Sequence, residues 1–355
     1  MGYKILAINP GSTSTKIAVY EDDLVIFTED ILHSDEELMP YDRVVDEFEM
    51  RKAHILAVLA SNNLKPEELS AVVGRGGQLV NIHAGGYLVT EDMKHRLIAP
   101  AASEHASNLG ALIADAIAAP IGIPAYIYDA VGSDELDDIA KITGFPGIVR
   151  KSLCHVLNSK AMARKAAAEV GKTYQDMNFV VAHLGGGISI SAHKNGRIID
   201  VITADGGPFS PERSGSAPLS DIVEMCYSGE YNKLEMKKKV AGQGGMKAYL
   251  GTSSCIEIEK MIADGNELAK NVYEAQAYQV AKGIGELSPT LRGKIDAIIL
   301  TGGVAHSKML TGMIAGYVDF IAPIRIMPGE NELESLAAGA LRILKGEEHA
   351  ESYKE

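Results

Sequence analysis

The chain opens with YKILAINPGSTSTKIAVY, residues 3–20, in which two apolar runs flank a cluster of small residues. The apolar runs predict two strands, and the cluster Pro10–Thr15 predicts the turn between them. Glycine, serine and threonine leave backbone N–H groups and hydroxyls open to solvent, as a phosphate oxygen requires. We therefore predict a phosphate-binding hairpin. Within it, Lys16 points either at the phosphate or into solvent.

A similar stretch, NFVVAHLGGGISISAH, occupies residues 178–193. When Gly185 is aligned with Gly11, the offset is 174, close to half of the 355 residues. A polar residue stands two places before the glycine in both copies, Asn9 in the first and His183 in the second. Each copy also ends in a two-residue turn signal, Asp22-Asp23 or Asn195-Gly196. The sequence thus predicts a duplicated unit whose two hairpins bind phosphate across a cleft.

Composition restricts the class of protein. A chain of 355 residues that is 46% hydrophobic has the length of two domains. The formal net charge of −13 argues against a nucleic-acid partner or an anionic membrane surface, although a few gathered cations still suffice for a nucleotide. Three scattered cysteines favour a reducing compartment. With no signal peptide and no unbroken membrane span in the pattern, we expect a soluble, cytoplasmic protein.

The order of elements predicts an α/β architecture. A third strand is expected over Leu24–Glu29, a helix within residues 41–61, and strands near residues 71–73 and 125–128. A short acidic helix is expected over residues 133–143, followed by a domain boundary near residue 148. The second half repeats the pattern of hairpin, helices and a buried strand over residues 297–300.

Two glycine-rich turns are candidates for ligand contact. The triple glycine Gly185-Gly186-Gly187 costs chain entropy and packs poorly, which favours close approach of a ligand over the alternative of a simple bulge. Gly302-Gly303 follows a strand and opens a helix, where backbone donors meet an anion or a nucleoside lies flat on glycine. Taken alone, this second turn is a weak signal.

Several charged residues have both a functional and a structural interpretation. Arg75 and Arg213 lie in glycine-rich loops and suit bidentate binding of a carboxylate or phosphoryl group, unless they are surface arginines. His183 ends an apolar strand, where a core histidine is the usual explanation, and its position before the triple glycine favours a functional role. Asp129 also ends a strand, where it positions a substrate or forms an Asx turn.

The region before the last expected helix offers two carboxylates. Glu330 and Glu332 are either the acidic first turn of that helix or, for one of them, a metal ligand. His105 is a weaker candidate still.

Eight segments together resemble the acetokinase family, and the resemblance covers nearly the whole chain. They are INPGSTSTK (8–16), GRGGQL (74–79), APAASEHASNLGA (99–111), YDAVGSDEL (128–136), VVAHLGGGISIS (180–191), PERSGSAPLSDIVE (211–224), ILTGGVAHS (299–307) and PGENELESLAAGA (328–340). The resemblance implies two ribonuclease-H-like domains, each a mixed five-stranded sheet with flanking helices, around a nucleotide cleft. It also implies that the last helix returns to the first domain. The expected domains are residues 1–148 plus 333–355, and residues 149–332.

The same resemblance implies ATP, Mg²⁺ and a short-chain carboxylate acceptor: butyrate first, with isobutyrate, propionate and acetate as alternatives. It implies that Asn9 and the Ser12–Ser14 turn bind phosphate and that Gly302 and Gly303 contact adenosine. In this interpretation His183 stabilises the transferring phosphoryl group. Arg75 and Arg213 bind the substrate carboxylate and stabilise the negative charge of the transition state. Asp129 lies in the active site, and Glu332 is associated with the metal. A homo-oligomer is expected.

Two further inferences concern the acceptor. A carboxylate, with a pKa of about 4 to 5, is already ionised at pH 7 and needs no base, unlike a sugar hydroxyl. This fits neutral Asn9, which stands where related sugar kinases carry aspartate. Gly76 and Gly77 stand where acetate kinases carry bulkier residues, so we expect a roomier pocket for a longer acyl tail.

Overall fold

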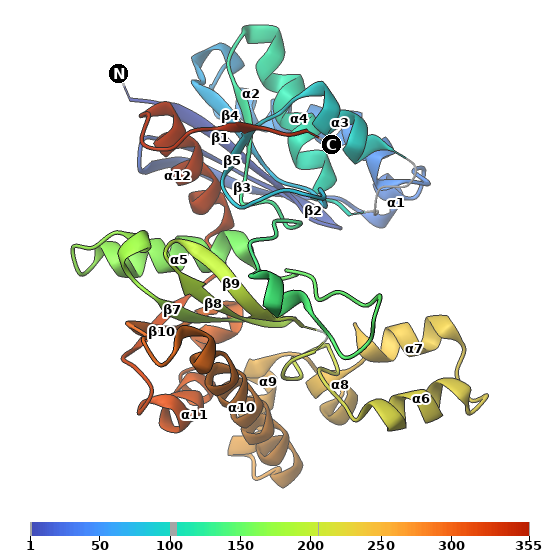
Figure 1. Cartoon of the computed structure of the whole chain (residues 1–355). Helices are drawn as coiled ribbons and strands as arrows, with labels where there is room; N and C mark the ends of the chain where they lie inside the picture. The colour runs from blue at the N-terminus through green and yellow to red at the C-terminus, as the bar shows by residue number, and fades with distance from the viewer. Residues whose placement is uncertain (1, 100–104, 205, 355) are drawn as a thin grey trace. The chain divides into compact units, whose positions relative to one another are not determined.

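The structure, a computed structural model, describes residues 2–99, 105–204 and 206–354 (Figure 1). The chain divides into two compact units, which are described separately. Unit 1 comprises Met1–Asp134 and Asn331–Glu355, and unit 2 comprises Glu135–Glu330.

Unit 1 is built on a seven-stranded sheet in the order β12-β5-β6-β4-β1-β2-β3. Its first three strands form an antiparallel meander, and β4 and β6 extend the sheet in parallel from β1. The strands are β1 (Lys4–Pro10), β2 (Ser14–Glu21), β3 (Leu24–Leu32), β4 (Ala71–Arg75), β5 (Gly86–Leu88), β6 (Ala125–Tyr128) and β12 (Glu351–Ser352).

Helices cover both faces of this sheet. The even-numbered side chains of β1, such as Leu6 and Ile8, join one apolar core with α2 and α4. On the opposite face α12 packs against β1, β4 and β6. The helices are α1 (Asp35–Leu38), α2 (Phe48–Ser61), α3 (Glu91–Ile98), α4 (Asn108–Ala118) and α12 (Glu332–Leu344), with 3₁₀ turns at Val44–Glu47, Pro66–Glu68 and Ala119–Ile121.

Unit 2 is built on a five-stranded sheet in the order β11-β10-β7-β8-β9. Its strands are β7 (Phe179–Leu184), β8 (Ile188–Lys194), β9 (Arg197–Ile202), β10 (Ala297–Gly302) and β11 (Ile324–Pro328). The odd-numbered side chains Phe179 and Val181 share a core with α5, and the even-numbered Val180 and Ala182 pack in the core with α10 and α11.

The helices of unit 2 lie mainly after its meander. They are α5 (Val156–Ala168), α6 (Leu219–Tyr227), α7 (Lys233–Val240), α8 (Gly245–Leu250), α9 (Cys255–Ala263), α10 (Glu267–Leu287) and α11 (Lys308–Val318), with 3₁₀ turns at Asp138–Lys141, Tyr174–Asp176, Ser288–Leu291 and Gly303–His306.

The two sheets repeat one topology. Strands β7, β8, β9, β10 and β11 pair in the same order and directions as β1, β2, β3, β4 and β6. The likeness extends to an irregularity: the third strand of each meander skips one residue of the register, Ile26 in β3 and Ile199 in β9. In both strands the skipped residue is the third residue of the strand. The turn before each strand contains a residue with positive φ, Asp22 before β3 and Asn195 before β9. The predicted duplicated α/β fold is confirmed, and the first sheet carries β5 and β12 in addition.

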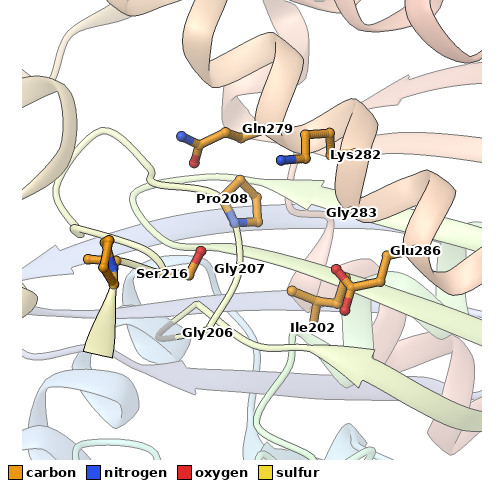
Figure 2. A pocket seen from close by; sticks show the side chains of 11 residues that line it. Ile202, Gly206, Gly207, Pro208, Ser216, Gln279, Lys282, Gly283 and Glu286 are labelled. Carbon is orange, nitrogen blue, oxygen red and sulfur yellow. The ribbon is translucent and has the colours of Figure 1, made fainter. Parts of the chain in front are cut away.

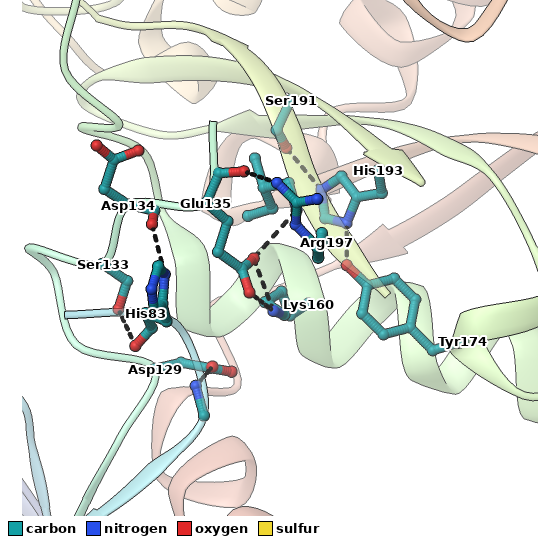
Figure 3. Close-up of polar contacts among 12 residues, drawn as sticks. His83, Asp129, Ser133, Asp134, Glu135, Lys160, Tyr174, Ser191, His193 and Arg197 are labelled. Atoms are coloured by element: carbon teal, nitrogen blue, oxygen red, sulfur yellow. Dashed lines mark hydrogen bonds and ion pairs between the residues drawn. The ribbon is translucent and has the colours of Figure 1, made fainter. Parts of the chain in front are cut away.

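The segment after β6 differs from the prediction. Residues 133–137 have no regular secondary structure and only Asp138–Lys141 form a 3₁₀ turn, so the predicted acidic helix over residues 133–143 is wrong. The acidic side chains are used in tertiary contacts instead of in a helix. Glu135 lies 2.9 Å from Lys160 Nζ, and its carboxylate also accepts from the Ile198 amide. Its carbonyl accepts from Arg197, as Figure 3 shows.

These contacts place residues 135–148 with unit 2, whereas the sequence assigned them to the first domain. Immediately before them, the Asp134 carbonyl lies 3.0 Å from His83 Nδ1, and Ser133 donates to the His83 carbonyl, both within unit 1 (Figure 3). In the motif APAASEHASNLGA, residues 100–104 lie outside the described residues. No helix among the described residues has both the length and the apolar character needed to span a membrane.

Candidate active site

Three of the predicted site residues meet in unit 1. Asn9, at the end of β1, donates from Nδ2 to Glu332 Oε2 and accepts at Oδ1 from Arg75 Nη1 at 3.3 Å. Arg75 Nη1 also lies 2.8 Å from Glu332 Oε1. Arg75 ends β4, and Glu332 is the first residue of α12, which packs on the same sheet. The contacts bring an amide, a guanidinium and a carboxylate together at one edge of the sheet.

The turn after Asn9 is held closed by backbone contacts and by a buried arginine. The Gly11 amide donates to the Ser14 carbonyl at 2.7 Å. Arg51 of α2, with 0% exposure, contacts the loop from the protein side. Ser12 is exposed and Ser14 is half-buried. Lys16 is exposed directly opposite Asn9 in the antiparallel register, so both side chains leave the same face of the hairpin.

Asp129 and His105 lie in polar environments of unit 1. Asp129 is buried at the end of β6, has a positive φ of 43°, and accepts at Oδ1 from the Gly85 amide at 2.8 Å. His105 Nδ1 accepts from the Ser107 amide at 3.2 Å. Burial and, to a smaller extent, the positive charge of Arg75 lower the pKa of His105. Both effects favour the neutral form of His105, and the second places the ring within electrostatic reach of Arg75.

His183, the counterpart of Asn9 in unit 2, is also held by a residue near the start of a helix. Asn158 of α5 lies with Oδ1 3.2 Å from His183 Nδ1 and 3.0 Å from Thr301 Oγ1. The Asn158 amide group donates to the carbonyls of Gly329 and Glu330, so its oxygen faces the histidine. Asn158 Oδ1 therefore accepts a hydrogen bond from the Nδ1–H group of His183. The ring of His155 stacks on His183, with centroids 3.7 Å apart and planes inclined by 8°.

The triple-glycine turn of unit 2 lies against both His183 and Arg213. A Cβ at Gly187 would lie 3.0 Å from Arg213 Nε, and a Cβ at Gly185 would lie 3.3 Å from His183 Nε2. Ser210 donates to the Gly186 carbonyl and accepts from the Arg213 amide, tying the loop that carries Arg213 to the turn. Glycine is needed here because the side chains of Arg213 and His183 approach the backbone.

The two glycines after β10 have different roles. Gly302 has a positive φ of 89°, and its Cβ would lie 2.3 Å from the Leu184 carbonyl, so glycine is required there by packing and conformation. At Gly303 a Cβ would meet no atom within 4 Å. Gly303 therefore leaves an open surface at the start of the Gly303–His306 turn, as contact with a flat nucleoside requires.

Gly76 and Gly77 do not provide the additional room expected for an acyl tail. A Cβ at Gly76 would lie 2.4 Å from Ala130 Cβ, and one at Gly77 would lie 2.4 Å from Asn108 Oδ1. The space beside both glycines is filled by the protein itself, so this part of the sequence argument is wrong. Their lack of a side chain serves close packing after β4.

A cavity of about 380 Å³ in unit 2 lies apart from these clusters (Figure 2). Figure 2 shows it between the end of β9 and α10, with Gln279, Lys282 and Glu286 from the helix. None of the predicted site residues line it.

For the metal, the structure distinguishes the two candidate carboxylates. Glu332 joins Asn9 and Arg75, whereas Glu330 belongs to unit 2, where its carbonyl accepts from Asn158. Among the described residues no three or more histidine, cysteine or carboxylate groups are placed so that together they could hold a metal ion. A single carboxylate still fits Mg²⁺, since this ion is commonly held by one or two carboxylates together with substrate phosphates.

Sequence reasoning missed the residues that support the site residues and loops through hydrogen bonds or ring stacking. Arg51, Ser210, His155 and Asn158 lie in stretches that read as ordinary helix or loop, and only the three-dimensional contacts reveal them. No local sequence pattern marks Arg51, because its position in the first turn of α2 and its burial are known only from the structure.

The fold is that of the acetate and propionate kinases. The structure of acetate kinase from Porphyromonas gingivalis matches 96% of this chain and 100% of its own with a TM-score of 0.78 at 20% identity. Propionate kinase from Francisella tularensis matches 95% of this chain and 98% of its own with a TM-score of 0.75 at 19% identity.

The sequence itself gives the family. Residues 146–316 match the model of the acetokinase family. Butyrate kinase 2 of Clostridium acetobutylicum is 50% identical over 356 aligned positions, covering 100% of both chains. The chain belongs to the acetokinase family.

Proposed function

We propose that this protein transfers the γ-phosphoryl group of ATP to butyrate, giving butyryl phosphate and ADP. The observation that carries the proposal is the 50% identity to a butyrate kinase over the full length of both chains. Membership of the acetokinase family makes the protein a kinase whose acceptor is a carboxylate.

The chemistry requires charge neutralisation and alignment. A carboxylate oxygen of butyrate attacks the γ-phosphorus, and the bond from that phosphorus to the β–γ bridging oxygen breaks, so that ADP leaves. Because the nucleophile is ionised at pH 7, no residue has to remove a proton. Neutral Asn9 at the end of β1 is consistent with this, since it supplies a hydrogen-bond donor and no base.

Arg75 and Arg213 are the residues we assign to the anionic groups. A guanidinium binds a carboxylate or phosphoryl group in a bidentate manner and retains its charge at every physiological pH. Arg75 is partly exposed, with 22% of its side chain accessible, and so is able to contact a substrate while bound to Glu332. We assign Asp129 to the same part of the active site.

His183 stabilises the transferring phosphoryl group in this proposal. Its Nδ1 is engaged by Asn158, which directs Nε2 toward the triple-glycine turn. The turn Gly185–Gly187 of unit 2 and the loop Ser12–Ser14 of unit 1, with Lys16, bind the phosphates of ATP, and Gly302 and Gly303 contact the adenosine. The support for this assignment is that each unit gathers its own predicted residues at the ends of β1 and β7.

Glu332 would hold Mg²⁺, which, when bound with the nucleotide, neutralises negative charge on the phosphates. This assignment rests on its position beside Asn9 and Arg75.

The acceptor panel tests the function. The purified protein is assayed with ATP and acetate, propionate, butyrate or isobutyrate, and acyl phosphate is trapped as the hydroxamate. We expect the highest kcat/KM with butyrate. A higher value with isobutyrate, propionate or acetate would replace butyrate with that acid and leave the reaction class intact, whereas no hydroxamate with any acid would refute the kinase assignment.

We further propose that the protein is cytoplasmic and forms a homo-oligomer. The described structure joins none of Cys154, Cys226 and Cys255 in a disulfide, which supports a reducing compartment. For the oligomer, the support is α6, which buries none of its residues although it carries apolar side chains: Leu219, Val223 and Tyr227 are exposed. A nine-residue helix whose residues are at most half-buried is marginal in water, so a covering partner is expected.

A further inference from the structure

We infer that Arg51 is the positioning residue of the first phosphate loop: it holds the loop's carbonyl oxygens on the protein side and so aims the amides of Ser12 and Thr13 at a phosphate. The inference rests on the proposed function, since it assumes that this loop binds the phosphates of ATP.

Arg51 directs most of its donors to a single short loop. Its Nη1 donates to the Gly11 carbonyl at 2.8 Å, the Ser14 carbonyl at 3.1 Å and Thr15 Oγ1 at 3.0 Å. Its Nη2 donates to the Ser12 carbonyl at 3.1 Å. Four acceptors within residues 11–15 therefore converge on one guanidinium. An arginine that only anchored α2 to the sheet would not need four acceptors in this loop.

The direction of the amides follows from covalent geometry. In a planar trans peptide the carbonyl oxygen of one residue and the N–H of the next point in opposite directions. No cis peptide bond is present in the described chain. Because the carbonyls of Gly11 and Ser12 point at Arg51, the N–H groups of Ser12 and Thr13 point away from it. Two adjacent donors on the open side of a loop form an anion-binding nest.

Glu47 fixes the guanidinium in this orientation. Arg51 Nε donates to Glu47 Oε2 at 2.8 Å, and Nη2 lies 2.6 Å from the same oxygen, one helical turn earlier in the chain. Arg51 has 0% exposure and Glu47 is buried as well. Because the pair is internally neutralised, Arg51 acts mainly by orienting peptide groups and only weakly as a charge on the phosphate.

The second loop is held in a related way by a different residue. Ser210 donates to the Gly186 carbonyl, which directs the Gly187 amide to the opposite side of that turn. Both loops are thus held through their carbonyls by a side chain from another element. Arg51 restrains its loop more strongly than Ser210 does, because it donates to three carbonyls and one hydroxyl at once.

The test compares Arg51→Lys and Arg51→Ala with the control Arg342→Met. Arg342 is a partly buried arginine of the same unit, bound to Glu348 and Tyr128, and it has no role in the loop. For each variant, kcat, KM for MgATP, KM for butyrate and Tm are measured below the melting transition. We expect both Arg51 variants to lose about 10- to 100-fold in kcat/KM for MgATP, with KM for butyrate nearly unchanged. Arg342→Met should lower Tm and leave all three kinetic constants near the parent values.

Chemical rescue separates positioning from general stability. In Arg51→Ala the vacated space keeps the acceptors of residues 11–15 and the Glu47 carboxylate. Millimolar guanidinium should restore part of kcat/KM for MgATP, whereas methylammonium, which lacks the planar fork, should not. Equal recovery with both cations would refute the orienting role.

A measurement on the unaltered protein covers the case in which the variants do not fold. With ¹⁵N-threonine labelling, the Thr13 amide should shift strongly downfield when MgADP binds. No shift in the presence of bound MgADP would refute the inference, as would Arg51 variants with parental kinetics. A parent protein without kinase activity or nucleotide binding would instead refute the proposed function.

Discussion

The guanidinium of Arg213 lies directly against the backbone of Gly187, where a Cβ would be 3.0 Å from Nε and 3.1 Å from Cζ. This relationship explains why the third glycine of the turn is a glycine, although Gly187 does not have the positive φ that would require one. Gly187 leaves room for the guanidinium of Arg213, to which we assign a role in the reaction.

Gly187→Ala should therefore impair catalysis without unfolding the protein. The added methyl group displaces the flexible end of Arg213, so kcat should fall about 10- to 100-fold while the unfolding free energy changes by less than about 1 kcal/mol. Steady-state kinetics and urea unfolding measure both. Gly312→Ala on α11, where a Cβ meets no atom within 4 Å, is the matched control and should retain parental kcat. Equal loss of activity in both variants would show that Arg213 is not the cause.

Glu332→Gln should change the requirement for Mg²⁺. Removing the carboxylate charge beside Asn9 and Arg75 weakens metal binding, so the Mg²⁺ concentration for half-maximal activity should rise about tenfold or more. Titration of activity with MgCl₂ at fixed ATP measures the shift. Glu330→Gln should leave this concentration near that of the parent, because the observed contact of Glu330 uses its backbone carbonyl. A larger shift in Glu330→Gln would transfer the metal role to that residue.

Acid should destabilise the protein through His193. This side chain is fully buried between Tyr174 and Ser191, and desolvation, followed by the charges of Lys160 and Arg164, lowers its pKa from 6.5 to about 3 (Figure 3). Between these values the unfolded state binds a proton that the folded state excludes. Stability should thus fall as pH falls from about 6.5 toward 3, by roughly 1.4 kcal/mol per pH unit for this one group.

His193→Gln tests this linkage, because glutamine replaces the ring by a group that does not titrate. Its unfolding free energy should depend less steeply on pH over the same range, by close to one proton, as measured by urea unfolding at several pH values. His349→Gln, which alters a residue of the C-terminal segment, serves as the control and should keep the parental slope. An unchanged slope in His193→Gln would mean that other groups dominate acid unfolding.

The exposed face of α6 should control assembly. Val223, with 53% of its surface exposed, lies on this helix beside Cys226. If copies of the chain cover the face, Val223→Glu should shift the sedimentation coefficient toward the monomer and expose Cys226 to a thiol reagent. Ile139→Glu, at a residue that is 82% exposed elsewhere in unit 2, should leave the sedimentation coefficient unchanged. A parent protein that sediments as a monomer with a rapidly modified Cys226 would contradict the prediction.

The sequence predicted the two meanders well because their signals are local. Apolar alternation, the small residues after Asn9 and His183, and the Asn195-Gly196 turn each define a hairpin within about twenty residues. The repeat then indicated the duplicated fold. Residues 133–143 were predicted wrongly because acidic residues with helical spacing also suit long-range ion pairs, and Glu135 pairs with Lys160.

The site was predictable only where glycine or a motif marks it. Asn9, Arg75 and Glu332 were identified from sequence, and the structure brings them together. Arg51 and Asn158 escaped notice because a buried polar side chain on a helix has no distinctive sequence neighbours. Gly76 and Gly77 were misinterpreted for a related reason: a sequence shows that side chains are missing but not what fills the space, here Ala130 and Asn108.

The return of α12 to the first sheet has a consequence for protein synthesis. The ribosome releases β1, β2, β3, β4 and β6 long before α12, whose buried residues Leu336, Ala337, Ala340 and Leu341 cover one face of that sheet. A nascent chain therefore carries an uncovered apolar surface on this sheet through most of translation. Its amino-terminal half completes its folding last. Glu332 arrives on the same helix, so no incomplete chain presents the carboxylate that Asn9 and Arg75 bind.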